Sequence, residues 1–501
     1  LTLGVGARGR GSGSLSCAVS GAWDGAALAS CPRLGCGRMM RPLAQCREWI
    51  RPMEPHTDEP LSDGTRARNR KGSLSRKGVR RCGVVAAALS IVMLLSGCLS
   101  LASLDEKPID KLTTGEAVIA LRLGGAEASA ALPGGTGDNW IVLLDSQGRG
   151  QAGHVERGER GDIAWTELGV SYGVQAEDFL TTQEGTQRIP RVGDRSVEYF
   201  RFALPDGRIE VISAARGSGI RADIIERDGT MTSVETDDKS GGFGLCGSRV
   251  LAIMNTEVSQ SMKSAAFEVY AAQSGGEGSE PEEFSVVVQL DDPAGATPRI
   301  LAAAPMIPGL RSVQHLYACE GNLLTAPSIQ VDDPIGARGS SVVAARGTLV
   351  LQRWDLSTGQ RSVSPVLDEA GNAIHLNEDL DIYGDKAILV GNEYRLISRH
   401  GHAFSINLTS GQGRHLFSIP EQVGQGDMVF QVTESGVYFL TDSSREHAVT
   451  LSYHPWDGDD SRVVLSTGSL EGYLRVRKLF SGGQRAIESF ALRPGWDGGA
   501  Q

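Results

Sequence analysis

Beyond residue 113 the sequence is divided into short apolar runs, and this division most limits the fold that the chain can adopt. Almost every run alternates apolar with polar residues or is rich in β-branched side chains. Alternation with a period of two is typical of β-strands, and no stretch longer than about ten residues shows the apolar spacing of an amphipathic helix. Gly-, Asp- and Asn-rich turns separate the runs, as at Pro205-Asp206-Gly207, where glycine accepts a positive φ. The sequence therefore predicts an all-β domain. The clearest predicted strands are residues 117–123, 140–145, 197–204, 208–213, 284–290, 348–354, 386–391, 403–408, 437–441 and 473–480.

The turns recur at a regular interval. The hexapeptide that begins at Asp355 closely parallels the hexapeptide that begins at Asn407, 52 residues later, and a further 52 residues lead to Asp459. Towards the N-terminus, comparable turns stand at Asp291 and Asp228. The repeating unit is thus about 50–65 residues long, which is enough for four short strands and their turns.

A four-stranded unit that recurs at this length resembles the blade of a β-propeller. The resemblance covers residues 113–501 and concerns period and turn chemistry rather than a signature motif. The turn at Asp355 is similar to the outer hairpin turn of quinoprotein-type propellers. Six turns, counting a weaker one near Leu168-Gly169, and a closing unit imply seven four-stranded blades, with six or eight left open. The closing blade would pair the C-terminal hairpin (473–492) with the strand at 117–123. One or two β-sandwiches are the alternative, but they do not explain the 52-residue interval.

The first 52 residues show neither helical nor strand periodicity and are rich in Gly, Ala, Arg and Ser. We expect either a disordered N-terminal extension or an over-extended reading frame. In the second case, translation would begin at Met39, Met40 or Met53.

Residues 53–97 have the order of an export signal. Residues 66–81 carry eight basic side chains and no acidic one, residues 82–95 are uncharged and mostly apolar, and Leu95-Ser96-Gly97-Cys98 follows. This arrangement resembles the signal peptide of bacterial lipoproteins, whose lipobox ends in an obligatory Cys. The resemblance implies that Cys98 receives a diacylglycerol and becomes the first residue of a protein anchored on the extracytoplasmic face of the cell membrane. Residues 98–112 are polar and contain Pro108, so we expect a flexible tether there.

An uncleaved membrane anchor is the alternative reading of the same region. Residues 82–104 are all uncharged, and these 23 positions are enough to span a bilayer about 30 Å thick. Because the basic cluster would stay on the cytoplasmic side, both interpretations place residues 113–501 outside the cytoplasm.

Charge is distributed unevenly along the chain, and this limits the partners that the body of the protein, residues 98–501, can bind. Residues 1–97 carry 15 Lys and Arg against 6 Asp and Glu, whereas residues 98–501 carry 34 against 54. A body this acidic argues against nucleic acid as a partner and against broad adhesion to anionic lipid.

Cysteine numbers indicate a disulfide in the body. Residues 98–501 contain only Cys98, Cys246 and Cys319. If Cys98 is acylated, two thiols remain in an oxidising compartment, which favours a bridge between Cys246 and Cys319. Two separate buried thiols are the alternative.

Two short motifs deserve comparison with metal sites. His400-Gly401-His402 could bring two imidazoles together, but a zinc site needs a third ligand, so a hairpin turn is the ordinary interpretation. Residues 457–461 contain three aspartates but lack the downstream glutamate of a calcium loop. We therefore expect no metal and no cofactor.

Two functions remain. The first is an exported, lipid-anchored propeller that binds an envelope protein or a small ligand, and the lack of catalytic motifs favours it. The second is an extracytoplasmic enzyme, a hydrolase or a quinoprotein-like protein, with acidic residues and His400 or His402 in the central channel.

Overall fold

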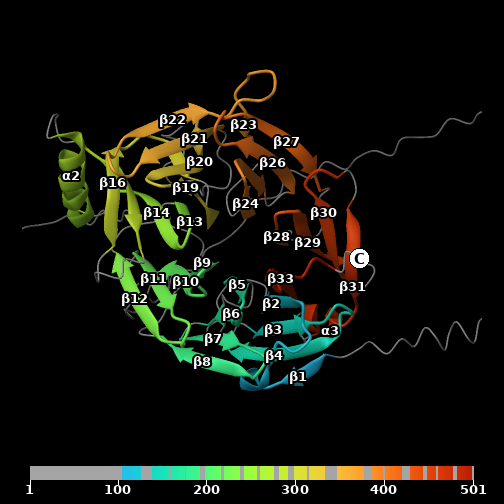
Figure 1. Ribbon diagram of the computed structural model, residues 1–501. Helices are drawn as coiled ribbons and strands as arrows, with labels where there is room; N and C mark the ends of the chain where they lie inside the picture. Colours follow the sequence, from blue (N-terminus) through green and yellow to red (C-terminus); the bar gives the residue numbers. More distant parts are fainter. Residues whose placement is uncertain are drawn as a thin grey trace, which may run out of the picture. The chain divides into compact units, whose positions relative to one another are not determined.

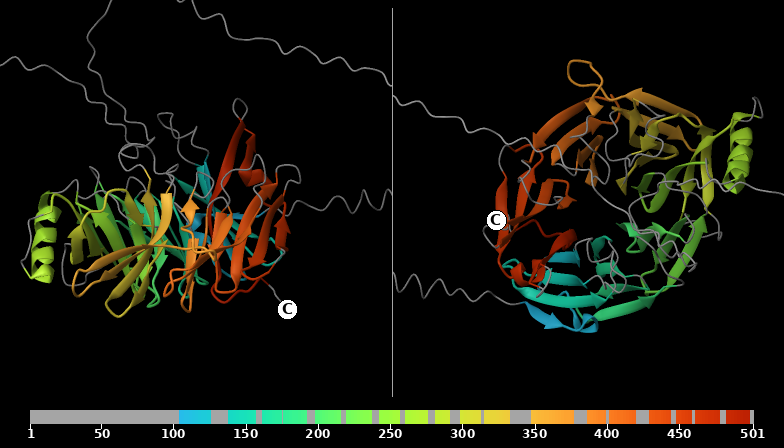
Figure 2. Two further views of the ribbon diagram at one scale, coloured as in Figure 1. Left: turned by 90° about the horizontal axis from the view of Figure 1, so that it is seen from above. Right: turned by 180° about the vertical axis from the view of Figure 1, so that it is seen from behind.

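The computed structural model describes residues 104–498, apart from 126–137, 157–160, 175, 192–197, 216–218, 237–241, 257–259, 276–280, 291–297, 313–314, 333–346, 377–385, 399–400, 420–428, 444–447, 459–460 and 478–481. The described strands form seven sheets arranged in a ring, which makes the body a seven-bladed β-propeller (Figure 1). The predicted fold class and blade number are confirmed. Within each blade, the first strand lies nearest the ring axis and the fourth lies on the rim (Figures 1 and 2).

Blade 1 joins the two ends of the folded body and closes the ring. Its strands, from axis to rim, are β33 (Gly482–Leu492), β2 (Ile119–Gly125), β3 (Asp138–Leu144) and β4 (Gly150–Glu156). Two short strands extend the sheet, β32 (Arg475–Arg477) next to β33 and β1 (Asp105–Lys107) next to β4. The closing pair is antiparallel, with Ile119 opposite Leu492 and Leu121 opposite Phe490. The predicted closure by the C-terminal hairpin is therefore present.

Blades 2 to 7 follow in chain order. Blades 2 and 3 contain β5 (Ile163–Thr166), β6 (Gly169–Gly173), β7 (Glu177–Thr181) and β8 (Thr186–Pro190), then β9 (Glu198–Ala203), β10 (Ile209–Ala214), β11 (Ile220–Ile225) and β12 (Met231–Thr236). Blades 4 and 5 contain β13 (Gly242–Cys246), β14 (Arg249–Asn255), β15 (Phe284–Gln289), β16 (Arg299–Pro305) and β18 (His315–Leu316), then β17 (Leu310–Ser312), β19 (Ala318–Glu320), β20 (Leu323–Val331), β21 (Gly347–Asp355), β22 (Arg361–Pro365) and β23 (His375–Leu376). Blades 6 and 7 contain β24 (Lys386–Val390), β25 (Glu393–Ile397), β26 (His402–Asn407) and β27 (Gly413–Ser418), then β28 (Val429–Val432), β29 (Gly436–Ser443), β30 (Ala448–Pro455) and β31 (Arg462–Thr467).

The core of the body lies between neighbouring blades. Successive side chains of a strand point to opposite faces of its sheet, so each blade offers apolar residues to both neighbours. Leu121 of blade 1 packs in one cluster with Leu440 of blade 7, and Phe200 of blade 3 packs in another with Phe243 of blade 4. Burial on both faces explains why predicted strands such as residues 284–290 are rich in apolar, β-branched side chains.

The recurring turn of the sequence connects the third and fourth strands of a blade. Asp355 and Asn407 occupy the same place in blades 5 and 6, and Asp228 lies in that turn of blade 3. Asp355 Oδ1 accepts the backbone N–H of Ser357 at 2.9 Å, and Asn407 Oδ1 accepts that of Thr409 at 3.1 Å. Short acceptor side chains that bind their own backbone two residues on stabilise such turns. The expected turns at Asp291 and Asp459 lie outside the described residues.

The weak turn expected near Leu168-Gly169 connects a different pair of strands from the other recurring turns. Leu168-Gly169 joins β5 to β6, the first and second strands of blade 2, and the third-to-fourth turn of this blade is at residues 182–185. Those residues are Thr-Gln-Glu-Gly. The sequence signal failed there because no Asp or Asn begins the turn.

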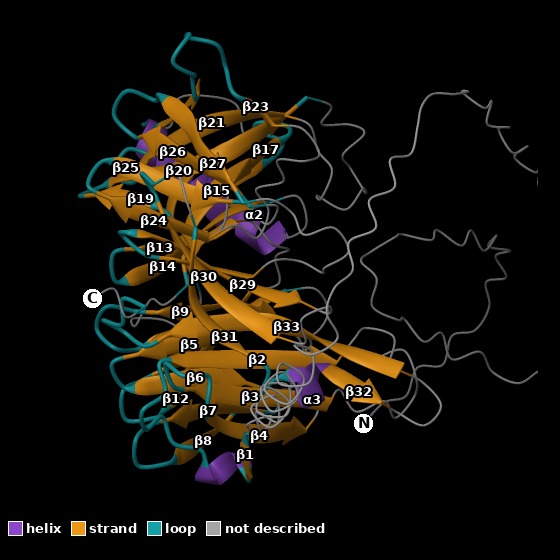
Figure 3. Ribbon diagram, turned by 90° about the vertical axis from the view of Figure 1, so that its right-hand side faces the viewer, coloured by secondary structure: helices purple, strands orange, loops and turns teal. Residues whose placement is uncertain are grey.

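Two α-helices depart from the pattern of strands and turns that the sequence predicts (Figure 3). Helix α2 (Gln260–Ser274) packs on the rim of blade 4. Near its end, Gln273 Nε2 donates to Leu301 O at 3.0 Å, and Gln273 Oε1 accepts the N–H of Ala303 at 3.3 Å. The helix thus covers part of the exposed edge of β16. Its apolar stripe escaped detection because alanine and glutamine occupy contact positions. Helix α3 (Glu471–Leu474) replaces the start of the strand predicted at 473–480, of which only β32 is a described strand.

The segment expected as a tether is folded where the structure describes it. β1 pairs in parallel with β4, and the 3-10 helix η1 (Ile109–Lys111) follows. Leu104 is 5% exposed, and Leu112 is fully buried between blades 1 and 2. The Tyr473 hydroxyl donates to Glu106 Oε1 at 2.8 Å. The flexible tether predicted for residues 98–112 is therefore wrong for its second half, because two leucines in that half have apolar partners that only the folded ring brings together.

We predict that Leu112→Ala lowers the free energy of unfolding by about 2–5 kcal/mol, because the change removes a buried side chain and leaves a cavity. Urea unfolding followed by tryptophan fluorescence measures the loss. Lys111→Ala is the matched control. The Lys111 side chain, next to Leu112 in the sequence, is 72% exposed, so its removal should change the free energy of unfolding by about 0.5 kcal/mol or less. Equal, small losses in both variants would show that the segment is not part of the core.

The turn at Asp355 predicts a pH dependence. The pKa of Asp355 lies below its ordinary value because the Ser357 hydroxyl, and then the Ser357 N–H, donate to the carboxylate. The folded pKa is below the unfolded one, so the charge stabilises the fold above the unfolded pKa of about 3.9 and this stability is lost as pH falls through the folded pKa. Asp355→Asn should therefore lower the urea midpoint at pH 7 and lose that difference below pH of about 4.

Asn407 provides the reciprocal test in the equivalent turn of blade 6. Asn407→Asp should introduce the pH dependence that Asp355→Asn removes, because its Oδ1 accepts the same kind of backbone N–H. Identical pH profiles for the two variants and the native chain would contradict this account of the turn.

Candidate functional site

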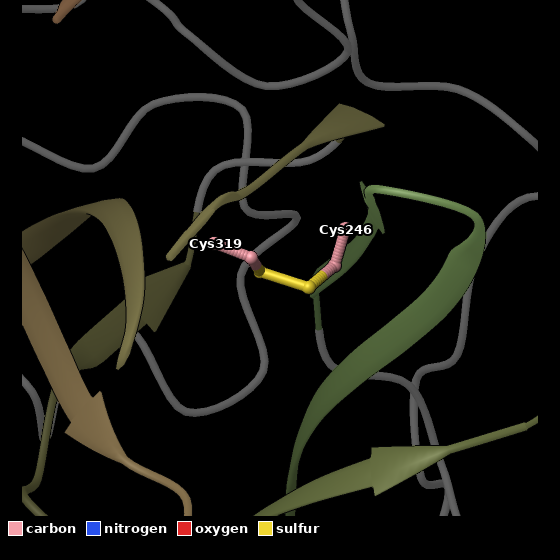
Figure 4. Close-up of a disulfide and its surroundings, with 2 residues drawn as sticks. All are labelled: Cys246 and Cys319. Atoms are coloured by element: carbon pink, nitrogen blue, oxygen red, sulfur yellow. A yellow bond between two sulfur atoms is a disulfide. The ribbon is translucent and has the colours of Figure 1, made fainter. Parts of the chain in front are cut away.

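The disulfide joins the innermost strands of blades 4 and 5 (Figure 4). Cys246 ends β13 and Cys319 lies in β19, with an S–S distance of 2.01 Å and a Cα–Cα distance of 5.6 Å. The bond pairs the two cysteines that the sequence indicated. It closes a loop with a sequence separation of 73, worth about 4 kcal/mol in the chain-entropy description. The other predicted site residue, Cys98, lies outside the described residues.

Backbone pairing accompanies the disulfide at the same junction. The inner strand of blade 5 is interrupted, and β18 pairs in parallel with β13 of blade 4, with Leu316 opposite Leu245. The next residue, Tyr317, is 2% exposed, and its ring lies against Gly244, where a Cβ atom would come within 2.8 Å of the ring. Burial raises the pKa of Tyr317 well above its ordinary value, as does the nearby Tyr394. Blades 4 and 5 therefore act as one covalently joined unit.

A group of buried charges lies in blades 1 to 3. We call it the interblade ion network. Its members are Arg122, Asp178, Arg191, Glu198, Arg201 and Glu488. The side chains are between 0% and 14% exposed, and three guanidinium groups face three carboxylates.

Arg201 is the centre of the network. Its Nη2 lies 2.7 Å from Asp178 Oδ1 and 2.8 Å from Glu198 Oε2. Burial by itself would lower the pKa of Arg201, but the two carboxylates outweigh it and raise the pKa above its ordinary value. Arg191 makes a two-pronged contact with the same aspartate, at 2.6 and 2.7 Å. Such bidentate geometry fixes the orientation of all three groups.

Two irregular inner strands bring these charges together. In β9 the pairing register with β10 skips Tyr199, which places Glu198 and Arg201 on the same face. In β33 the pairing register with β2 skips Glu488, whose Oε2 lies 3.0 Å from Arg122 Nε. A β-bulge redirects a side chain in this way and is often found beside functional sites.

Glycines make room for the network. A Cβ atom at Gly124 would lie 1.7 Å from Glu488 Oε1, and one at Gly173 would lie 2.1 Å from Arg191 Nη2. Gly161 lies between the two halves, since its Cβ would come within 3.1 Å of Arg122 Nη1 and 3.2 Å of Glu198 Cδ. Glycines inside or beside apolar runs, together with an arginine in the run at 117–123, were the signals that sequence analysis passed over.

A further ion pair reaches across the ring. Lys386 begins β24 in blade 6, and its Nζ lies 3.8 Å from Oδ2 of Asp162, immediately before β5 of blade 2. These blades are not neighbours, so the two side chains approach each other near the axis. Both are half-buried, at 33% and 24% exposure. Each of the four carboxylates described here thus has a cationic partner.

Of the two histidines in the His400-Gly401-His402 motif, the structure describes His402, which shares a hydrogen-bonding partner with His415. His402 Nδ1 and His415 Nε2 each lie 2.9 Å from the Ser418 hydroxyl, between the outer strands of blade 6, and His400 lies outside the described residues. The pKa of His415 is lowered by partial burial and by His402. Among the described residues, no group of three or more His, Cys, Asp or Glu side chains is placed to hold a metal ion. The two described histidines lie in β26 and β27, the third and fourth strands of blade 6, and so belong to a different blade from the interblade ion network.

Comparisons with known proteins find distant structural similarity and no match in sequence. No protein-family profile matches the chain, and no curated protein sequence matches it. A mutant of the Synechocystis apocarotenoid oxygenase is similar over 70% of this chain and 89% of its own, with 11% identity and a TM-score of 0.40. A catalytically inactive virginiamycin B lyase from Staphylococcus aureus is similar over 66% and 93%, with 11% identity and a TM-score of 0.34. A chain of the mitotic checkpoint complex is similar over 62% and 80%, with 8% identity and a TM-score of 0.34. Similarities this distant assign no function to this chain.

We predict that Asp178→Asn lowers the free energy of unfolding by about 3–5 kcal/mol, because it removes one partner of a buried ion pair and leaves two guanidinium groups undercompensated. Urea unfolding at neutral pH measures the loss.

Glu177→Gln is the matched control. Glu177 precedes Asp178 in the same strand, and its ion pair with Arg188 is exposed, with the two side chains at 34% and 53%. A screened pair of this kind contributes about 1 kcal/mol or less. Losses of the same size in both variants would show that the network does not stabilise the junction of blades 2 and 3.

Proposed function

We propose that this protein is an exported lipoprotein, anchored through Cys98 on the extracytoplasmic face of the bacterial cell membrane, whose propeller acts as a binding or scaffold module. The proposal takes its address from the basic segment, the apolar segment and the lipobox-like residues 95–98. Among the described residues, no helix has the length and apolar character needed to cross a bilayer.

The observation that carries the binding role is that Asp178, Glu198, Glu488 and Asp162 each have a basic partner. Asp178, Glu198 and Glu488 accept hydrogen bonds from guanidinium groups, and Asp162 faces Lys386. A general acid or base must exchange a proton with substrate and be within hydrogen-bond reach of it. These carboxylates instead use their oxygens to hold the blades together, which favours a rigid platform over a hydrolase centre at this position.

The disulfide supports an extracytoplasmic location. Bridges of this kind persist in oxidising compartments and are rare in the cytosol. The Cys246–Cys319 bond joins inner strands of adjacent blades, so it belongs to the framework. A rigid ring that presents its connections to solvent suits recognition of another envelope protein or a small ligand.

We predict that Cys98→Ser releases the protein from membranes, because an unmodified serine carries no acyl chains. Membrane fractionation and metabolic labelling with a fatty acid measure the effect. Ser96→Ala is the matched control, since a small residue at that position should leave processing intact. Retention of the Cys98→Ser protein in membranes would instead support the uncleaved anchor.

Pull-down of the mature protein from solubilised membranes tests the binding role. We expect at least one envelope protein to be recovered with the native chain and again with Cys98→Ser, since the propeller is unchanged. Hydrolysis of a chromogenic substrate panel, together with recovery of no specific protein, would favour the enzyme.

A further inference from the structure

We infer that the rim of blade 1 is the part of the propeller held next to the membrane, and that blades 4 and 5 lie on the far side from it. This inference rests on the proposed acylation of Cys98. It concerns a property that the anchor alone does not determine, namely which edge of the ring faces the lipid.

The first argument is the shortness of the connection. Leu104 is the first described residue, and six peptide steps separate it from Cys98. An extended chain spans at most about 3.6 Å per residue, so the acylated cysteine lies within about 22 Å of Leu104. The folded segment 104–112 removes the second half of what would otherwise be a longer tether.

The second argument is the firmness of the attachment. Asp105–Lys107 adds a parallel strand to the outer strand of blade 1, with Asp105 opposite Gln151 and Lys107 opposite Gly153. Leu104 is buried among residues of blades 1 and 7, and Glu106 accepts the hydroxyl of Tyr473. Further along, the Thr186 hydroxyl donates to Leu112 O at 3.1 Å, which ties the segment to blade 2. Pulling the chain away from the rim would break all of these contacts together.

The third argument is electrostatic. Residues 98–501 carry 34 basic against 54 acidic side chains. A body of this charge is repelled by an anionic bilayer, so a large area of contact between one face of the ring and the lipid is unfavourable. The short attachment and the repulsion are both satisfied when the ring stands on the rim of blade 1.

In a seven-bladed ring, blades 4 and 5 are the ones farthest from blade 1 (Figure 1). Helix α2 lies on the outer edge of blade 4, and the disulfide joins this blade to blade 5. Blades 4 and 5, which the disulfide joins, would therefore face the partner proteins that the proposed binding role requires.

Energy transfer from two single labels tests the orientation. The acylated full-length mature protein is reconstituted into vesicles of phosphatidylethanolamine and phosphatidylglycerol that carry an acceptor dye on the headgroup. The donor is placed at Gln147→Cys, in the exposed turn before β4, or at Ala265→Cys, on the exposed side of α2. The native cysteines of the mature chain are acylated or bridged, so each variant offers one thiol to the dye. We expect transfer from position 147 to exceed transfer from position 265 several-fold.

Lengthening the tether tests whether the short connection causes the orientation of the ring. About thirty Gly and Ser residues inserted before Leu104 add a root-mean-square reach of roughly 30 Å and should remove most of the difference between the labels. The same segment inserted after Gly498 is the matched control and should leave the difference unchanged. Equal transfer from both labels with the native tether, in protein that still floats with the vesicles, would overturn the orientation and leave the anchor intact. Failure to float, with no transfer from either label, would refute the anchor and the orientation with it.

Discussion

The antiparallel pairing of β2 with β33 is the interaction on which the rest of the propeller depends. Without it, blade 1 would lose its inner strand and the ring would expose two sheet edges. The pair joins Ile119 to Leu492 and also brings Arg122 to Glu488, 366 residues away along the chain. Ring closure therefore creates both the apolar interface between blades 7 and 1 and the first half of the interblade ion network.

Two different chemistries join the blades in different parts of the ring. Between blades 4 and 5 a disulfide and a parallel strand pair join the inner strands, whereas blades 1 to 3 share six buried charged side chains. A covalent bond restricts the unfolded chain, while a buried ion network is strongly penalised when one partner is missing. The network is therefore stable only when all of its charges are paired. The two bulges and three glycines that make this pairing possible form one unit with the charges.

The N-terminal segment connects this architecture with the proposed location. If Cys98 is acylated as proposed, the route from membrane to ring is short and enters at one edge, because residues 104–112 are folded onto blade 1. A lipoprotein with a long tether would sample many orientations, but one with a short tether presents a defined side to its surroundings. The orientation of the binding surface would then be a consequence of where β1 pairs.

Local patterns in the sequence determined the strands, the repeat, the closing strand and the cysteine pair, because alternation, turn-forming residues and cysteine parity are readable without distant contacts. The turn at Asp355 could be matched to that at Asn407 on this basis. Tertiary structure alone decided the placement of Glu198 and Glu488, since a bulge is set by the register of two paired strands and leaves no period in the sequence. It also decided that Leu104 and Leu112 belong to the core and that α2 covers β16, because in each case the apolar or polar partners come from segments far along the chain.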